Sequence, residues 1–313
     1  MKKPLVVLTG PTAVGKTALS IALAKKINGA VISADSMQVY KYMDIGSAKA
    51  TKKEMQGVKH YLIDELLPEE EFHVVKFQAK RYLEKIYDES KIPIIAGGTG
   101  FYIQALLYDV DFTEQECDRT YRKQLERLAA EKGNRYLFEM LLERDQKAAA
   151  AIHPNNVRRV IRALEFYEKS GGLKISEHNE NERKKESPYQ FAYFVLTDER
   201  RRLYERIDKR VEKMLSDGLV DEVRKLREMG YTKDMVAMQG LGYKELLRYL
   251  DGEIALSEAV YMIKRDTRHF AKRQLTWFKR ERDVIWLDKQ DFAHDDGAIL
   301  SEMLKTLKNK NII

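Results

Sequence analysis

A glycine-rich segment near the N-terminus constrains the possible folds of this chain more than any other feature. Residues 10–17 read Gly-Pro-Thr-Ala-Val-Gly-Lys-Thr, which fits the pattern G-x-x-x-x-G-K-[ST]. The segment follows the apolar run Leu5–Leu8 and precedes residues 18–23, whose composition favours a helix. A strand, a loop of this pattern and a helix in that order predict a P-loop.

A P-loop binds a phosphate-rich anion. Its glycines allow backbone amides to turn inward, and the helix that follows adds the positive end of its dipole. We expect the ammonium of Lys16 to reach the terminal phosphates and the hydroxyl of Thr17 to bind Mg²⁺. The pattern indicates a pyrophosphate group but not the molecule that carries it. The predicted phosphate-binding residues are Gly10, Pro11, Thr12, Ala13, Val14, Gly15, Lys16 and Thr17.

Further apolar runs of strand length are spaced along the chain. Helical or loop segments separate the first four of them, which is the rhythm of βαβ units in a parallel sheet. The sequence therefore predicts an α/β fold with a P-loop NTPase-like parallel sheet flanked by helices. The expected strands are Leu5–Leu8, Val31–Ser33, Tyr61–Ile63, Ile92–Ala96, Tyr193–Leu196 and Val284–Leu287.

The middle of the chain has a different pattern. Strand signals vanish between residues 112 and 190, and long stretches with helical spacing replace them. We interpret 112–190 as an all-helical insertion domain in a core formed by 1–111 and 191–313. The expected helices of the insertion are 121–132, 135–151 and 156–169, and the polar residues 171–187 are expected to form a mobile surface segment. In the core, 199–229 has helical periodicity, with Gly218 as a possible break.

Composition excludes several classes of protein. The chain has no apolar run of 18 residues and no signal-like N-terminal segment, so we expect a cytoplasmic protein without membrane contact. Its single cysteine, Cys117, excludes an internal disulfide and a cysteine-based zinc site.

The basic charge of the chain is concentrated in one segment. The net charge is +7, and residues 264–282 contain eight Lys or Arg against two acidic residues. Phe270, Trp277 and Phe278 are interleaved with these bases, a pattern that suggests a polyanion partner. The alternative is an amphipathic helix with a solvated basic face and buried aromatic residues.

Two polar segments follow expected strands, where parallel sheets bind their ligands. Asp35 follows 31–33, and its carboxylate suits a Mg²⁺ ligand, a general base or the cap of a helix. Gly97 ends the strand at 92–96, where a P-loop ATPase is expected to carry a metal-binding Asp. That difference argues against ordinary NTP hydrolysis. Thr99 can bind a phosphate, and the neighbouring glycines would allow a bulky ligand to approach closely.

Taken together, these motifs form a specific pattern. The motifs described above and several further motifs occur in a fixed order along the chain. They lie at residues 10–17, 35–40, 46–49, 57–64, 97–103, 153–165, 238–245 and 271–278. Over essentially its whole length the chain resembles the bacterial tRNA dimethylallyltransferases, also called tRNA isopentenyltransferases. It differs from the family pattern at Ser47, where Thr is usual, and at 59–61, where Pro-His-His is frequent.

The resemblance implies transfer of a dimethylallyl group from dimethylallyl diphosphate to N6 of adenosine 37 of tRNA. It implies that Lys16 and Mg²⁺ stabilise the diphosphate leaving group and that Asp35 accepts the N6 proton. Thr99 and one arginine of the pair Arg206 and Arg210 are expected to bind the diphosphate, and Arg210 fits the family pattern better. We expect the chain to act as a monomer.

A second set of residues is expected to bind the tRNA anticodon stem-loop, because a stacked adenine must be extruded before it can reach a P-loop. Arg158, Arg159 and Arg162 have helical spacing and could instead form a solvated face. The expected tRNA-binding residues are Asp35, Ser36, Met37, Gln38, Phe101, Arg158, Arg159, Arg162, Lys272, Arg273, Gln274 and Trp277.

Two other classes of function fit part of the sequence. One is a small-molecule enzyme, either a P-loop nucleoside kinase or a prenyltransferase that acts on free adenine nucleotides. A kinase would need the metal-binding acid that Gly97 replaces, and a free nucleotide would not require the basic segment. The other is a non-catalytic RNA-binding module, which would leave Asp35 and Thr99 without a function.

Overall fold

A computed structural model describes residues 2–70, 72, 79–108 and 119–313 of the chain. Cys117 and the predicted domain boundary at 111–112 lie outside these residues. The chain divides into two compact units, which we call the core unit, Met1–Leu107 with Pro188–Ile313, and the helical unit, Tyr108–Ser187. The core resumes before residue 191 because the strand that begins at Tyr189 already pairs with Lys3.

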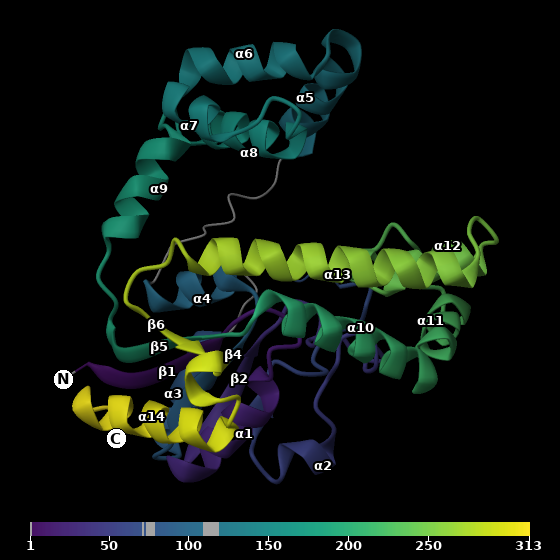
Figure 1. Cartoon of the computed structure of the whole chain (residues 1–313). Coiled ribbons are helices and arrows are strands. Elements are labelled where there is room, and N and C mark those ends of the chain that lie inside the picture. The colour runs from purple at the N-terminus through teal and green to yellow at the C-terminus, as the bar shows by residue number, and fades with distance from the viewer. Residues whose placement is uncertain (1, 71, 73–78, 109–118) are drawn as a thin grey trace. The chain divides into compact units, whose positions relative to one another are not determined.

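The core unit contains a six-stranded sheet in which all neighbouring strands are parallel (Figure 1). The strand order is β3-β2-β4-β1-β5-β6. The predicted fold class is confirmed, and each of the six expected runs contributes a strand, although Ile63 lies beyond the end of β3. The strands are β1 (Lys3–Thr9), β2 (Gly29–Ala34), β3 (His60–Tyr61), β4 (Ile92–Gly97), β5 (Tyr189–Thr197) and β6 (Val284–Asp288).

Helices connect and cover these strands, as parallel strands require. Among the described residues, the core unit also contains two short 3-10 helices, Ala237–Gln239 and Lys289–Phe292. Its α-helices are α1 (Lys16–Lys26), α2 (Lys52–Met55), α3 (Ala79–Asp88), α4 (Gly100–Leu107), α10 (Arg200–Ser216), α11 (Leu219–Glu228), α12 (Tyr243–Leu250), α13 (Leu256–Phe278) and α14 (Asp296–Asn309).

The near-continuous apolar sequence of β1 reflects burial on both faces of the sheet. Val6 and Leu8 point into a cluster that includes Leu23 of α1 and Met303 of α14. Leu5, whose side chain alternates to the opposite face, is equally buried. The P-loop therefore leaves a strand that is fixed on both sides.

The strand register aligns the ends of three neighbouring strands. Gly97 at the end of β4 lies opposite Thr9 of β1 and Ala34 of β2. The Thr9 hydroxyl also donates a hydrogen bond of 2.7 Å to the Gly97 carbonyl. As a result, the P-loop, the segment that begins at Asp35 and the segment that contains Thr99 all start at the same edge of the sheet.

Two of the long predicted helices are interrupted. The helix expected over 199–229 breaks at Gly218, as its glycine suggested, because the backbone there adopts φ 99°. The helix expected over 135–151 is instead two helices, because Asp145 leaves helical geometry and caps the second one through the amide of Ala148.

The helical unit has its own hydrophobic core. Leu125, Leu141 and Leu164 are buried together, and the carboxylate of Glu165 binds Arg122 through two hydrogen bonds of 3.0 and 2.7 Å. These contacts join the first helix of the unit to the fourth. The helices are α5 (Arg119–Lys132), α6 (Asn134–Arg144), α7 (Gln146–Ala151), α8 (Val157–Lys169) and α9 (Ile175–Lys184).

The segment 171–187, predicted to be a mobile surface segment, is largely exposed but contains the helix α9. The buried carboxylate of Asp145 accepts hydrogen bonds from the amide of Ser176, at 2.9 Å, and from its hydroxyl, at 2.7 Å. A polar sequence without apolar periodicity gives no local signal for such a contact, since it depends on a residue about 30 positions earlier.

Candidate active site at the carboxyl edge of the sheet

The P-loop is held in an open turn that its glycines permit. Gly10 and Gly15 have φ of 145° and 104°, and the carbonyl oxygen of Leu196 occupies the position that a Cβ of Gly10 would need. The half-buried side chain of Lys16 folds back over the loop. Its ammonium donates hydrogen bonds of 2.9 Å to the carbonyls of Gly10 and Pro11.

Lys16 is electrostatically primed for an anion. The pKa of its ammonium is lowered to about 7, chiefly by burial and also by the nearby charge of Arg210, while the carboxylate of Asp35 opposes the shift. A lysine with this pKa is easily neutralised. An anion beside it would restore its full positive charge.

Arg210 of α10 reaches the same loop from a distant part of the sequence. Its Nη1 donates a hydrogen bond of 3.3 Å to the hydroxyl of Thr12. Burial lowers the pKa of its guanidinium, and Asp35 again acts in the opposite direction. Lys16, Arg210 and Asp35 therefore form one cluster of interacting charges.

Arg206, the other arginine proposed for the diphosphate, has an acidic partner. Its guanidinium is paired with the fully buried carboxylate of Asp198, which follows β5. A guanidinium already neutralised in this way is a poor anion ligand, so we withdraw Arg206 from the candidate diphosphate site and retain Arg210.

Asp35 occupies a tight turn directly after β2. One carboxylate oxygen, Oδ1, accepts a hydrogen bond of 2.9 Å from the amide of Met37. That bond fixes the orientation of the carboxylate and leaves Oδ2 available within the described residues. The carboxylate is thus held by its own backbone beside two cations.

Thr99 contributes a hydroxyl to the same edge. Its amide donates a hydrogen bond of 3.0 Å to the carbonyl of Ala34, and its carbonyl accepts the first hydrogen bonds of α4 from Tyr102 and Ile103. Within the described part of the chain, the Thr99 hydroxyl has no hydrogen-bond partner. The hydroxyl is therefore positioned by backbone contacts on both sides and can accept or donate to a ligand.

The side-chain amide of Gln274 on α13 has partners within the chain. Its side chain is buried, its Oε1 accepts a hydrogen bond of 2.8 Å from the amide of Thr12, and its Nε2 donates one of 3.0 Å to the carbonyl of Gly98. A contact of Gln274 with tRNA stays a prediction. Both ends of its amide are used to join the P-loop to the segment that contains Thr99.

The glycines near Thr99 make room for protein, and the idea that they admit a bulky ligand is wrong. A Cβ at Gly98 would lie 2.1 Å from Nε2 of Gln274, and a Cβ at Gly100 would lie 2.3 Å from the indole of Trp277. Trp277 also packs edge-on against Phe101 with ring centroids 6.2 Å apart. Phe101 itself is 39% exposed, so one aromatic edge of this cluster reaches the surface.

The basic segment 264–282 is less uniform than its sequence suggests. Its first half is neutralised by acidic partners: Lys264 binds Glu212 at 2.6 Å and Arg268 binds Asp208 at 3.1 Å. Lys272 and Arg273 follow on α13, are exposed, and have no ion pair among the described residues. The available positive charge of the segment therefore lies toward its C-terminal half.

The residues after Asp35 are largely committed to internal contacts. The Oε1 of Gln38 accepts a hydrogen bond of 2.9 Å from the hydroxyl of Ser33, and its Nε2 lies 3.4 Å from the carbonyls of Ser47 and Ala48. The amide of Gln38 therefore has partners within the chain, and its contact with an adenine stays a prediction. Ser36 and Met37 remain half-buried at the site.

In the helical unit, the three arginines lie on the solvated side of α8. Arg158, Arg159 and Arg162 are exposed, whereas Ile161 and Leu164 are buried. None of the three arginines has an ion pair among the described residues. An unpaired cluster of this kind is available to an external anion.

Comparison with known proteins now identifies the family. The sequence model for IPP transferase matches residues 38–281. The tRNA dimethylallyltransferase of Lachnoclostridium phytofermentans is 62% identical over 99% of both chains, and that of Clostridioides difficile is 51% identical over 99% of both. The chain belongs to the IPP transferase family. The expected resemblance is therefore confirmed.

Solved structures agree with this assignment. The tRNA isopentenylpyrophosphate transferase of Bacillus halodurans superimposes with a TM-score of 0.73 at 44% identity, covering 99% of this chain and 98% of the other. A eukaryotic dimethylallyltransferase acting on tRNA gives a TM-score of 0.83 at 33% identity, covering 99% of this chain and 79% of the other. Members of the IPP transferase family are prenyltransferases, which generally use a divalent metal.

The donor set at the P-loop fits a phosphate-bound Mg²⁺. Among the described residues, no three His, Cys, Asp or Glu side chains cluster as a metal cage. Mg²⁺ at nucleotide and diphosphate sites typically takes only one or two protein ligands and completes its shell with phosphate oxygens and water. The exposed hydroxyl of Thr17, at the start of α1, can supply such a ligand.

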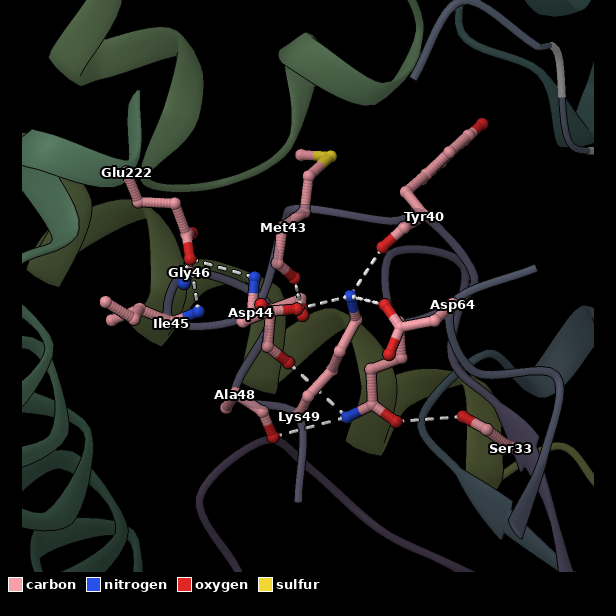
Figure 2. Close-up of polar contacts among 12 residues, drawn as sticks. Ser33, Tyr40, Met43, Asp44, Ile45, Gly46, Ala48, Lys49, Asp64 and Glu222 are labelled. Carbon is pink, nitrogen blue, oxygen red and sulfur yellow. Dashed lines mark hydrogen bonds and ion pairs between the residues drawn. The ribbon is translucent and has the colours of Figure 1, made fainter. Parts of the chain in front are cut away.

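Several residues that shape the site gave no functional signal in the sequence. Lys49 is almost fully buried, and its ammonium contacts the Tyr40 carbonyl at 2.5 Å and the carboxylates of Asp44 and Asp64 at 2.7 and 2.5 Å (Figure 2). Lys49 belongs to the motif at 46–49, which could have pointed to it. Glu222, which holds the same loop, lies in an ordinary amphipathic helix and carries no local signal.

A cavity lies outside the site. This cavity of about 420 Å³, near the ends of β5 and β6, is lined by Thr197, Leu275, Lys279, Trp286 and Asp288, and none of these belongs to the P-loop or to the segments of Asp35 and Thr99.

Of the helices described, none is both long enough and apolar enough to cross a membrane.

Proposed function

We propose that this chain transfers the dimethylallyl group of dimethylallyl diphosphate to N6 of adenosine 37 in tRNA. The products are N6-(dimethylallyl)adenosine beside the anticodon and free diphosphate. The observation that carries the proposal is the cluster of Lys16, Arg210 and Asp35 at one sheet edge, where two cations face one carboxylate. The names of the relatives support the same chemistry.

The cations suit a diphosphate leaving group. As the bond between C1 of the allyl group and the diphosphate oxygen breaks, negative charge grows on that oxygen. Lys16, Arg210 and the loop amides stabilise this charge, and Thr99 adds a hydrogen bond from its hydroxyl. Electrostatic stabilisation of this kind is usually the largest single contribution to catalysis.

Thr17 is the residue proposed to hold Mg²⁺. When bound there with the phosphate oxygens, the ion supplies further neutralisation of the diphosphate charge. Because β4 ends in Gly97, that strand supplies no acidic ligand for the ion. The donor's own oxygens and water would therefore complete the coordination.

Asp35 supplies the other half of the reaction. The lone pair of adenine N6 is delocalised into the ring, so the nitrogen is a weak nucleophile. The N6–C1 bond forms as the C1–O bond breaks, the electron pair leaves with the diphosphate, and the N6 proton passes to the carboxylate of Asp35. The hydrogen bond from the Met37 amide keeps this carboxylate oriented during the transfer.

We assign recognition of tRNA to exposed basic side chains and to aromatic side chains. Arg158, Arg159 and Arg162 of the helical unit and Lys272 and Arg273 of α13 would bind backbone phosphates. Phe101 and Trp277 offer aromatic surface for an RNA base, and Ser36 and Met37 flank the general base. RNA loops are commonly read by such a combination of stacking and phosphate contacts.

We also propose that the chain acts as a cytoplasmic monomer. Sedimentation velocity with and without tRNA would test this, because a dimeric mass in both conditions would contradict it.

One incubation tests the proposal. The enzyme is mixed with dimethylallyl diphosphate labelled in the allyl group, Mg²⁺ and unmodified tRNA, and the digested nucleosides are separated. We expect label in N6-(dimethylallyl)adenosine, and none when position 37 is guanosine. Consumption of ATP with phosphorylation of a small alcohol, and no labelled nucleoside, would contradict the proposal and favour the kinase alternative.

A further inference from the structure

One carboxylate outside the reacting cluster is bound by an unusual number of backbone amides. Glu222 of α11 accepts hydrogen bonds from three successive amides, those of Asp44, Ile45 and Gly46, at 2.9, 2.7 and 3.1 Å. It also accepts one of 2.7 Å from the hydroxyl of Tyr243 on α12. Figure 2 shows the carboxylate pointing into the loop that these amides form.

These contacts determine the shape of the loop 42–49. Tyr42 and Ala48, near its two ends, have φ of 67° and 51°, a backbone region that residues with side chains adopt at some cost. The ring of Tyr243 occupies the space beside Gly46, where a Cβ would lie 2.5 Å from a ring carbon. Side chains of α11 and α12 therefore stabilise the conformation of the loop, which does not depend on the backbone preferences of its own residues alone.

The loop is in turn the support of the segment that carries Asp35. Its carbonyls at Ser47 and Ala48 face the Nε2 of Gln38, and the Oε1 of Gln38 accepts a hydrogen bond from Ser33 at the end of β2. Gln38 and Ser33 thus bracket Asp35 in the sequence. A shift of the loop would move Gln38 and, with it, the turn that fixes the carboxylate.

We propose that Glu222 is a positioning residue for the general base Asp35, acting through the loop 42–49 and Gln38. The inference rests on the proposed function. Glu222 touches neither the P-loop nor Asp35, so its effect falls on proton transfer and alignment of the acceptor, and binding of the diphosphate donor is unaffected.

A substitution that keeps size but removes charge tests the inference. Glu222→Gln replaces one acceptor oxygen by a donor, which cannot face three amide N–H groups. We expect kcat to fall between about tenfold and about 100-fold, the scale of small misplacements of a catalytic group. The KM for dimethylallyl diphosphate stays within about twofold of the original, because the P-loop contacts are unchanged.

The chain offers a matched control. Glu228 lies on the same helix, is exposed and has no ion pair among the described residues, so Glu228→Gln removes an equal charge without touching the loop. This variant should retain the original kcat and KM. A transfer reaction seen in the original chain and in Glu228→Gln establishes the proposed function independently of the inference.

A double-mutant cycle separates positioning from a general loss of stability. Glu222→Gln and Gln38→Ala are compared singly and together by kcat and by thermal unfolding. We expect the double variant to be about as slow as the slower single variant, because both break the same connection, although the two side chains do not touch. Multiplication of the two losses in kcat would overturn the proposal.

A milder variant covers the case in which Glu222→Gln unfolds. Tyr243→Phe removes one hydrogen bond to Glu222 and retains the ring that packs on Gly46. We expect a smaller fall in kcat with the same unchanged donor KM, because the carboxylate of Asp35 is less well oriented. An unchanged kcat in a folded Tyr243→Phe would also overturn the proposal.

Discussion

The P-loop site of the core unit and helix α8 of the helical unit hold their positive charge in opposite ways. In the core unit, Lys16 and Arg210 are withdrawn from water, and burial lowers the pKa of both. In the helical unit, Arg158, Arg159 and Arg162 are exposed on α8, and the partly exposed Arg122 is paired with the buried carboxylate of Glu165. Buried cations are costly unless an anion accompanies them, whereas exposed cations are not.

This difference indicates two distinct functions for charge. Burial at the P-loop disfavours the charged forms of Lys16 and Arg210, and the diphosphate that we propose to bind there would stabilise them; perturbed pKa values of this kind are typical of catalytic sites. The helical unit keeps cations hydrated, where they attract a polyanion over distance and lose strength in salt. Substitutions in the two units should therefore change different measured quantities.

The largest effect is expected from Asp35→Asn. The amide cannot accept the N6 proton, so kcat should fall by about 10²–10⁴-fold, the usual contribution of general-base catalysis. The affinity for tRNA should change little, because the side chain keeps its size. Single-turnover rates and filter-binding affinities measure the two quantities, and an unimpaired rate would remove Asp35 from its assigned function.

A smaller effect is expected from pH acting on Lys16. Because the pKa of Lys16 is about 7, its ammonium loses its proton in the free enzyme as the pH rises above that value. A bound diphosphate favours the charged form. Donor binding therefore takes up a proton, and donor affinity should fall as pH rises above about 7, by at most about tenfold per pH unit.

Calorimetry of donor binding in buffers with different ionisation enthalpies measures this proton uptake. Lys16→Met should abolish it and weaken binding at every pH. If uptake persists in Lys16→Met, another group titrates with the donor, and the contrast between buried and exposed cations loses its main support.

A third, more gradual effect is expected from the arginines of α8. Replacing Arg158, Arg159 and Arg162 together by alanine should weaken tRNA binding and flatten its dependence on salt, by about one unit of logarithmic slope for each phosphate that the variant no longer neutralises. The rate of a saturated single turnover should not change. Arg135→Ala is the control, because Arg135 is exposed but paired with Glu139. Equal slopes in the two variants would mean that α8 does not bind phosphates.

Much of the core unit could be predicted from sequence because its signals are local. The P-loop, the runs of apolar residues that became β1 to β6 and the break at Gly218 each depend on neighbouring residues only. The placement of Asp35 and Thr99 at one edge followed from the rule that ligands bind at the carboxyl ends of parallel strands.

The contacts that could not be predicted involve polar side chains whose partners are distant in sequence. Gln274 binds Thr12 across 262 positions, and Arg206 is paired with a buried Asp198. An exposed tRNA ligand and an internal hydrogen-bonding residue have the same amino-acid type, so only the packing of α10 and α13 distinguishes them. The helix α9 was missed for the same reason, since its anchor is Asp145.

The smallest effect is expected at that anchor. Burial alone would raise the pKa of Asp145, but hydrogen bonds from Ser176 and from the amide of Ala148 lower it below its ordinary value. A carboxylate with a lowered pKa in the folded state stabilises that state above its unfolded pKa of about 3.9, and the stabilisation is lost as pH falls through the folded value.

Hydrogen exchange of the full chain tests this in the helical unit alone. Asp145→Asn should cost about 0.5–2 kcal/mol, the range for a lost helix cap, and should increase exchange of the amides at the start of α7 and α9. The acid-dependent part of that exchange should disappear in the variant, whereas Glu139→Gln, an exposed acid in α6, should leave it intact. Because Asp145 bears no relation to the diphosphate cluster, donor affinity should be unaltered. If the free energy of donor binding changed as much as the free energy of opening of α9, the two units would be energetically coupled. Their charged side chains could then not be treated as independent.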